Sequence, residues 1–275
     1  MSAAIQHIPL RLPRHNVSPR QVARAGDIWR LFQEAAVIAA DNVGWSGARF
    51  IAERVGFVVS RMTVLHHREL SYGEAVQGRT WLRDWRRDTI SRREIRLDVA
   101  GQNVASAAQQ WVHVSLGDGV ESISPARASA ALLADFQPVG GVAEDSPVLP
   151  PVTEAIHAEV HRLHFDVWHT WMDPFAHVNH PMYVDWFDES TARLLIGAGL
   201  DPQGLVPVAE QVRFKRGLIG GCSVVVQTQI KGFTAAGDVV LQHRVETAEG
   251  VLAADGTTVR RMVDQVGLDR LAALS

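Results

Sequence analysis

The sequence predicts an α+β fold made of two tandem units, in each of which an antiparallel sheet wraps around one long helix. Two observations lead to this prediction: a helical pattern of apolar residues occurs once in each half of the chain, and several short strand-like runs follow each pattern. A stretch rich in proline and glycine, residues 137–152, has no sustained period. We therefore expect a first domain at residues 1–136, a linker at 137–155 and a second domain at 156–275.

In the first half, the helical pattern covers residues 28–43, with Asp27 as the expected N-cap and Gly44 just beyond the end. Residues 5–12 are predicted to form an edge strand before this helix. Strand-like runs follow the helix at residues 56–66, 75–84, 91–100 and 104–115, with turn signals between them.

The second half repeats this order. A strand is expected at residues 160–168, a helix at 181–196, and further strands at 208–215, 223–231, 238–247 and 257–265. When the two helices are aligned, Phe32 falls opposite Phe187 and Glu34 falls opposite Glu189. The residue similarity is weak, but the shared order of elements indicates an internal repeat.

Composition restricts the class of protein. The chain has 275 residues, 47% of them hydrophobic, a formal net charge of −3 and a single cysteine, Cys222. One cysteine forms neither an internal disulfide nor a thiolate metal cage, and the charge argues against a nucleic-acid partner. Neither a membrane helix nor a signal peptide is indicated. We expect a cytoplasmic protein with no cofactor and no metal.

The most informative stretch is residues 168–190. Asp173, His177, Asn179 and His180 lie within eight residues, immediately before the second helical pattern. Asn179 is expected to act as N-cap and Pro181 to lie in the first turn, so that the helix starts near His180. The sequence therefore predicts an acidic and histidine-rich loop at the positive end of a helix dipole.

Five positions of this stretch carry a family resemblance: Asp173, His177, Val178, Asn179 and Tyr183. On these residues the chain resembles the hotdog-fold thioesterases, most of all the double-hotdog acyl-ACP thioesterases and the 4-hydroxybenzoyl-CoA thioesterase-like group. Those families show an Asp, then His-Val-Asn-Asn and an aromatic residue. The plant-type enzymes have an Asn where this chain has Phe175, and His180 replaces the second Asn. Their catalytic set and their fatty-acyl substrate are therefore not carried over.

The resemblance implies a thioester hydrolase that acts on an acyl-CoA or an acyl carrier protein thioester. Asp173 is then the general base or the nucleophile, and His177 orients Asp173 or a water molecule. Asn179 holds the loop, and backbone N–H groups near His180 form an oxyanion site. Glu189, further along the helix, is a second candidate carboxylate, although an ion pair with Arg193 at i+4 explains it equally well.

Substrate-binding candidates fall into two groups. Aromatic residues near the loop are expected to shape the acyl site, and basic residues are expected to meet coenzyme A phosphate or an acidic carrier. The aromatic candidates are Trp171, Tyr183 and Trp186, and the basic candidates are Arg213, Lys215 and Arg216.

The repeat also bears on the first half of the chain. Ser18, Val22 and Arg24 fall opposite Asp173, His177 and Asn179 in the repeat, so we expect the first half to be catalytically silent. A hotdog hydratase or dehydratase and a non-catalytic acyl-thioester-binding protein are the alternative functions. Pairing into a homodimer is also left open.

Overall fold

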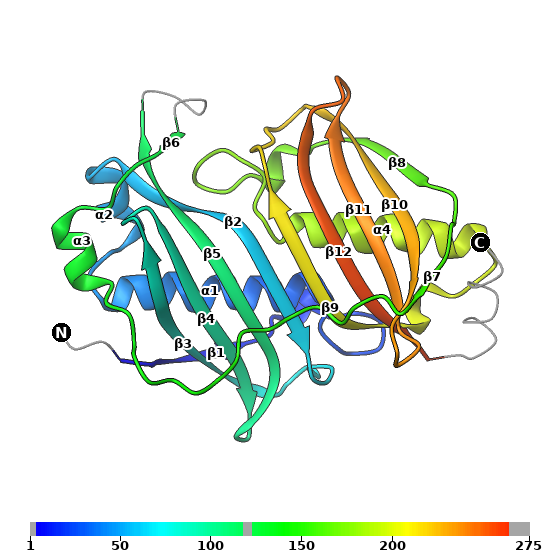
Figure 1. Ribbon diagram of the computed structural model, residues 1–275, viewed down its shortest axis with the longest axis horizontal. Helices are drawn as coiled ribbons and strands as arrows, with labels where there is room; N and C mark the ends of the chain where they lie inside the picture. Colours follow the sequence, from blue (N-terminus) through cyan, green and yellow to red (C-terminus); the bar gives the residue numbers. More distant parts are fainter. Residues whose placement is uncertain (1–3, 118–122, 264–275) are drawn as a thin grey trace. The chain divides into compact units, whose positions relative to one another are not determined.

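The computed structural model of the chain describes residues 4–117 and 123–263, which form two compact units. The first unit runs to Pro147 and the second starts at Val148, except that residues 18–20 and 24–26 belong to the second unit. Each unit contains one long helix and one antiparallel sheet (Figure 1). The predicted α+β fold with a central helix in each half is confirmed.

In the first unit the antiparallel sheet has the strand order β1-β3-β4-β5-β2. Its elements are β1 (Gln6–Arg11), η1 (Arg14–Asn16), α1 (Ala25–Asn42), α2 (Gly47–Ala52), β2 (Val55–His66), β3 (Ala75–Arg86), β4 (Ile90–Val99), β5 (Gln102–Leu116), β6 (Ile123–Pro125) and α3 (Ala130–Asp135). The short helices α2 and α3 are not among the predicted elements.

Helix α1 lies behind this sheet in Figure 1, and its residues Phe32, Ala35 and Ala39 are fully buried. Ala35 approaches the sheet closely, because a Cβ atom built on Gly78 of β3 would lie 3.4 Å from Ala35 Cβ. The helix starts at Ala25, two residues before the predicted cap. Asp27 is instead a buried first-turn residue whose Oδ1 accepts a hydrogen bond from Arg30 at 3.0 Å.

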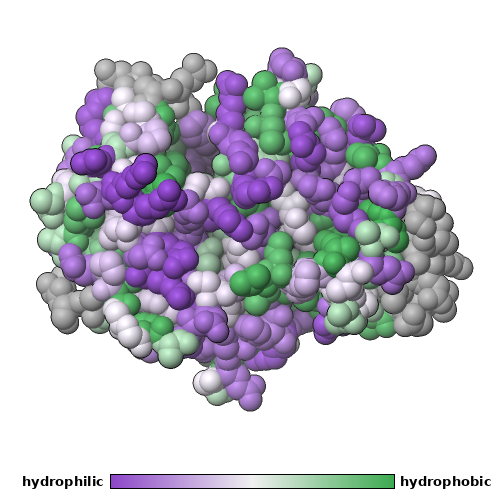
Figure 2. Space-filling model, viewed as in Figure 1, coloured by the Kyte–Doolittle hydropathy of each residue, from purple (hydrophilic) through white to green (hydrophobic). Residues whose placement is uncertain are grey.

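The segment predicted as a linker is fastened to the first unit over much of its length. Glu144 accepts from Arg79 at 2.7 Å and from Arg96 at 3.0 Å, and Arg83 donates to Ser146 at 3.1 Å. The segment crosses the face of the sheet that is opposite α1 (Figure 1). In the same view, hydrophilic side chains cover much of the surface, with apolar patches between them (Figure 2). Residues 137–147 therefore belong structurally to the first unit.

In the second unit the sheet order is β9-β12-β11-β10, and the short strands β7 and β8 both pair with β10. The elements are β7 (Glu154–Ala155), β8 (His161–Asp166), η3 (His169–Trp171), α4 (Met182–Gly197), η4 (Pro202–Gly204), β9 (Leu205–Phe214), β10 (Ser223–Phe233), β11 (Val239–Thr247) and β12 (Leu252–Met262). β12 starts five residues before the predicted strand, and the predicted residues 264 and 265 lie outside the described residues.

Helix α4 is positioned against its sheet by Phe187. The ring of Phe187 stacks on His243 of β11, with centroids 4.3 Å apart and planes at 10°. A Cβ atom on Gly256 of β12 would lie 2.5 Å from the Phe187 ring. Glycine at this position therefore lets the helix approach the strands, although it weakens the sequence signal for a strand.

A buried hydrogen-bond network surrounds the same ring. Nδ1 of His243 bonds with Thr228 and Nε2 bonds with Thr258, each at 2.9 Å, and Ser190 of α4 bonds with Thr228 at 2.8 Å. Burial, reinforced by the charge of Arg260, lowers the pKa of His243 to about 3. The imidazole is therefore neutral at pH 7, with one ring nitrogen donating and the other accepting.

Arg260 of β12 ties the helix to the sheet by charge. Its guanidinium is buried, donates to Asp188 of α4 at 2.8 Å and also pairs with Glu210 of β9. A buried arginine that is matched by two carboxylates fixes the helix in one position.

No helix in the described part of the chain is long and apolar enough to cross a membrane.

Replacing His243 with Phe is expected to destabilise the second unit by about 2 kcal/mol at pH 7, because the hydroxyls of Thr228 and Thr258 each lose their hydrogen bond to the imidazole. The depressed pKa of His243 contributes stability that is present above pH 6.5 and lost as pH falls toward 3. The difference between wild type and variant should therefore shrink as pH falls. Urea unfolding between pH 7 and pH 4 measures it, with His164→Phe on β8 as an exposed control. Parallel stability curves would contradict this account.

Candidate active site

The loop between η3 and α4 folds back on itself and presents Asp173. The backbone N–H of Asp173 donates to His177 O at 2.7 Å, and the N–H of Ala176 donates to Asp173 O at 2.9 Å. Ala176 closes this turn with a φ of 56°, which is uncommon for a residue other than glycine. Met172 and Val178 form a β-bridge at the base of the loop. The loop is therefore a defined structure.

The carboxylate of Asp173 is oriented by backbone donors. Its Oδ1 accepts from the N–H of Phe175 at 2.8 Å and from the N–H of His177 at 3.3 Å. Its Oδ2 accepts no hydrogen bond from any residue in the described ranges. Burial raises the pKa of Asp173, and the two N–H donors and the charge of His177 offset part of this rise. One oxygen is thus fixed, and the other is placed to take a proton.

His177 lies between the Asp173 turn and the segment that joins β9 to β10. A Cβ atom on Gly217 would lie 2.7 Å from Cδ2 of the His177 ring, so the ring rests on the glycine backbone. The N–H of Val178 donates to Leu218 O at 2.8 Å, which joins the two segments. The glycine is therefore required by a close approach, and sequence reasoning did not select it.

The start of α4 differs from the prediction. The helix begins at Met182, two residues after the predicted start near His180, and Pro181 occupies the N-cap position without a side-chain cap bond of its own. The backbone of Asn179 accepts from the N–H of Met182 at 3.0 Å and donates to Trp171 O at 2.9 Å. The main chain of Asn179 therefore links η3 to the first turn of α4. A proline at the cap position offers no side-chain acceptor, and the N–H groups of Tyr183 and Val184 donate to the carbonyls three residues before them.

Aromatic side chains extend from the surface into the core beside this loop. Trp168 is exposed and stacks on Trp171, with ring centroids 5.0 Å apart. The ring centroids of Trp171 and Trp186 are 5.5 Å apart. Those of Trp186 and Tyr183 are 4.8 Å apart. Phe165 of β8 packs on Trp186 at 5.1 Å. The structure therefore brings together the three predicted aromatic residues, Trp171, Tyr183 and Trp186.

Two of these side chains lie deep and carry polar atoms. Nε1 of Trp186 is buried and has no hydrogen-bond partner within residues 4–117 and 123–263. Burial raises the pKa of the Tyr183 hydroxyl, and the nearby charges of Cys222 and Asp173 raise it further. The hydroxyl of Tyr183 therefore stays neutral near the Asp173 carboxylate. His180 packs its ring against Phe214 at 6.0 Å.

Two family models match the chain in turn. Residues 12–118 match the acyl-ACP thioesterase N-terminal domain, and residues 167–274 match the thioesterase-like superfamily. The chain belongs to the double-hotdog thioesterases. It is therefore a thioester hydrolase, and the matched second half contains the Asp173 loop.

Three solved structures are similar to this double-hotdog thioesterase over nearly its whole length. An oleoyl thioesterase (putative) from Lactobacillus plantarum is 20% identical, with a TM-score of 0.79 and coverage of 96% of this chain and 98% of that one. An acyl-ACP thioesterase from Bacteroides thetaiotaomicron is 14% identical (TM-score 0.70, coverage 94% and 98%). The 12:0-ACP thioesterase from Umbellularia californica is 15% identical (TM-score 0.72, coverage 94% and 97%). At these identities the likeness establishes the shared fold. No curated protein sequence matches the thioesterase.

The basic candidates of the thioesterase lie at the end of β9. Arg213 is paired across the sheet with Asp255, its Nε donating at 2.6 Å. Lys215 and Arg216 are exposed, and both of their backbone N–H groups donate to Ala253 O, at 2.8 and 3.1 Å. They immediately precede Gly217, on which His177 rests. All three basic residues are thus exposed, and Lys215 and Arg216 lie next to the segment that contacts the loop.

Glu189 is not brought to the Asp173 loop. It lies seven residues after the start of α4, about 10 Å along the helix axis. Its exposed carboxylate pairs with Arg193 at 2.8 Å, in the i+4 arrangement that the sequence also allowed. Glu34, its counterpart in the repeat, is exposed as well. The structure gives Glu189 the place of a surface ion-pair partner.

Replacing Gly217 with Ala is expected to lower kcat/KM of the thioesterase by about tenfold or more, because the added methyl displaces His177 and a misplaced group near the reacting atoms costs up to about 100-fold. Kinetics with an acyl thioester and a thermal melt measure activity and folding separately. Gly47→Ala is the matched control, since a Cβ atom there meets nothing within 4 Å. Unchanged kinetics in Gly217→Ala would show that the position of His177 does not matter.

Proposed function

We propose that the chain hydrolyses an acyl carrier protein thioester at the Asp173 loop and releases a carboxylic acid. The orientation of Asp173 carries this proposal: backbone N–H groups hold Oδ1, no described residue donates to Oδ2, and burial raises the pKa of the carboxyl group. A base whose pKa moves toward the working pH is more effective in proton transfer. No other carboxylate is proposed to take part.

As general base, Asp173 removes a proton from a water molecule through Oδ2. The water oxygen attacks the thioester carbonyl, the carbon–sulfur bond breaks, and the thiolate takes up a proton. The products are a carboxylic acid and the free thiol of the carrier. Direct attack by the carboxylate would give an anhydride that water then hydrolyses, and the fixed Oδ1 is compatible with either route.

Neighbouring groups support this chemistry. The positive end of the α4 dipole faces the loop and favours the negative charge that develops on the carbonyl oxygen. His177 favours the ionised form of Asp173. Asn179 keeps the loop in place through its main chain, and His180 follows it at the helix start. We assign Asn179 and His180 to positioning the loop and the helix start, and His177 to positioning and to the charge of the site.

The aromatic side chains are proposed to receive the acyl group. Trp171, Tyr183 and Trp186 form a continuous contact from the surface toward the core beside Asp173. Such a surface binds apolar acyl groups by burial and places them next to the base. Activity measured with a panel of acyl substrates would identify the acyl group that this surface receives.

The first unit is proposed to lack a second working site. The positions opposite Asp173, His177 and Asn179 carry Ser18, Val22 and Arg24, so no carboxylate occurs there. Each chain therefore has one active site. The match to two thioesterase models favours hydrolysis. No observation favours the hydratase or the acyl-binding alternative.

Replacing Asp173 with Asn is expected to lower kcat/KM by about 10²- to 10⁴-fold, because the amide does not accept the proton. The fold should be retained, since Asn still accepts the two backbone bonds. A raised carboxyl pKa means that the ionised form costs stability, so wild type should lose stability relative to the variant as pH rises through that pKa. In wild type, kcat/KM should fall at acidic pH with an apparent pKa above 3.8.

The matched control for this experiment is Glu189→Gln, which removes an exposed carboxylate from the same unit and should change kcat/KM by less than about twofold. Thiol release from acyl-ACP and from acyl-CoA measures both variants, and mass analysis of the product excludes hydration. Full activity in Asp173→Asn, or a collapse in Glu189→Gln, would move the chemistry away from the Asp173 loop.

For the carrier, we propose that Lys215 and Arg216 contact the acidic face of an acyl carrier protein. The double variant Lys215→Glu and Arg216→Glu should raise KM for acyl-ACP by about tenfold at low salt and leave kcat unchanged, with a smaller effect as ionic strength rises. An acyl-pantetheine thioester should show no change. Arg127→Glu, another exposed arginine, is the control. An equal rise in KM for acyl-pantetheine would contradict the proposed contact with the carrier protein.

A further inference from the structure

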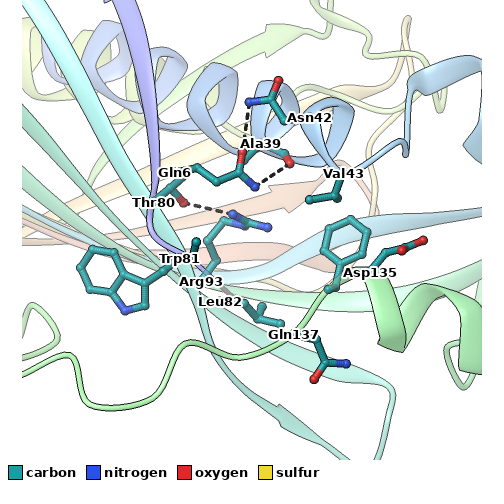
Figure 3. A pocket seen from close by; sticks show the side chains of 12 residues that line it. Gln6, Ala39, Asn42, Val43, Thr80, Trp81, Leu82, Arg93, Asp135 and Gln137 are labelled. Carbon is teal, nitrogen blue, oxygen red and sulfur yellow. Dashed lines mark hydrogen bonds between the residues drawn. The ribbon is translucent and has the colours of Figure 1, made fainter. Parts of the chain in front are cut away.

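The first unit contains a cavity of about 180 Å³ at the carboxyl-terminal end of α1. It is lined by residues from β1, α1, β3, β4 and the end of α3, all of them within the first unit. Figure 3 shows the guanidinium of Arg93 in the middle of this group, with Gln6 and Asn42 above it. The cavity shares no residue with the Asp173 loop.

Arg93 is buried, with 7% of its surface exposed. It lies on β4 opposite Leu82 of β3, on the sheet face that carries Thr80 and faces α1. Its Nη1 donates to Thr80 Oγ1 at 3.1 Å, and Thr80 in turn donates to the backbone oxygen of Glu94 at 3.1 Å. Within the described residues, Arg93 has no other hydrogen bond and no acidic partner.

The other buried arginines of the described chain are matched by carboxylates. Arg96 pairs with Glu94 at 3.3 Å and with Glu144 at 3.0 Å. Arg260 pairs with Asp188 and Glu210. Placing a guanidinium away from water without a counter-charge is costly, so structural arginines acquire partners. Arg93 departs from the pattern that this protein itself follows.

Arg93 remains a cation at neutral pH. Burial lowers its pKa to about 10, which is still well above the physiological range. The one carboxylate among the lining residues, Asp135, accepts a hydrogen bond from Trp45 at 3.0 Å and lies 3.9 Å from Arg49. Its side chain points away from Arg93 in Figure 3. The positive charge in the cavity is therefore not neutralised by the lining.

The remaining walls define what fits beside this charge. Val43, Leu82 and Phe136 supply an apolar side. Gln6 uses both ends of its amide, donating to Ala39 O and accepting from Asn42, each at 3.0 Å. A cavity of about 150 Å³ accommodates benzene, so the volume here suits a small ring or a short alkyl chain with one charged group.

We propose that this cavity is a binding site for a small monocarboxylate, whose carboxyl group pairs with the Arg93 guanidinium and whose apolar part packs against Val43, Leu82 and Phe136. The planar guanidinium fork matches a carboxylate with two parallel hydrogen bonds. A single cation neutralises one negative charge, which favours a carboxylate over a phosphate dianion. The site is independent of the proposed hydrolysis.

The first test is calorimetric titration of the full chain with benzoate and with benzamide, an uncharged molecule of the same shape. Benzoate should bind at least about tenfold more tightly, because only the carboxylate pairs with the charge. Equal binding of the two, no binding of benzoate at millimolar concentrations, or tighter binding of inorganic phosphate would overturn the proposal. Asp173→Asn should bind benzoate as wild type does, which separates this cavity from the hydrolytic site.

Variants locate the binding. Arg93→Met keeps an unbranched apolar side chain but removes the guanidinium, and it should weaken benzoate binding by at least about tenfold with little effect on benzamide. Arg92→Met removes a neighbouring exposed arginine and should leave benzoate binding unchanged. Val43→Trp fills the cavity without touching the charge and should abolish binding of both molecules, which keeps the test decisive if Arg93→Met does not fold. Unchanged benzoate binding in Val43→Trp would contradict the assignment.

Discussion

The close approach of α4 to its sheet is the constraint on which the structure of the second unit depends. Phe187 lies flat on His243 and fills the space that a side chain at Gly256 would occupy. The threonines on either side of His243, and Arg260 with its two carboxylates, hold the same contact with polar groups. Because these partners come from α4 and four strands, the helix is fixed in one position. The position of the loop that precedes the helix is thereby fixed as well.

The Asp173 loop is held next to this fixed helix start, where we propose that the reaction takes place. The turn uses main-chain donors to orient one carboxylate oxygen, and partial burial raises the pKa of the same group. These effects act in opposite directions on the carboxylate charge, since the donors stabilise it and desolvation penalises it. The result is a carboxylate that is held in place and remains able to accept a proton.

Buried charge is used in two ways in this protein. Arg96 and Arg260 are structural, because each is surrounded by carboxylates that fix a strand, the 137–147 segment or a helix. Arg93 is buried beside a cavity with a threonine as its hydrogen-bond partner among the described residues. The same residue type thus stabilises the fold where it is matched and marks a ligand site where it is not.

The sequence by itself determined the fold class, both central helices and the aromatic and acidic residues of the loop, because helical periodicity and the Asp173 to Tyr183 pattern are local signals. It also left Glu189 undecided between a carboxylate of the site and a partner of Arg193, since one helix face does not reveal what packs on it. The tertiary structure decided the helix start at Met182, the early start of β12 at Leu252 and the roles of Gly217 and Gly256. Each of these depends on what another segment of the chain brings into contact, and so does the unpaired charge of Arg93, which no local spacing encodes.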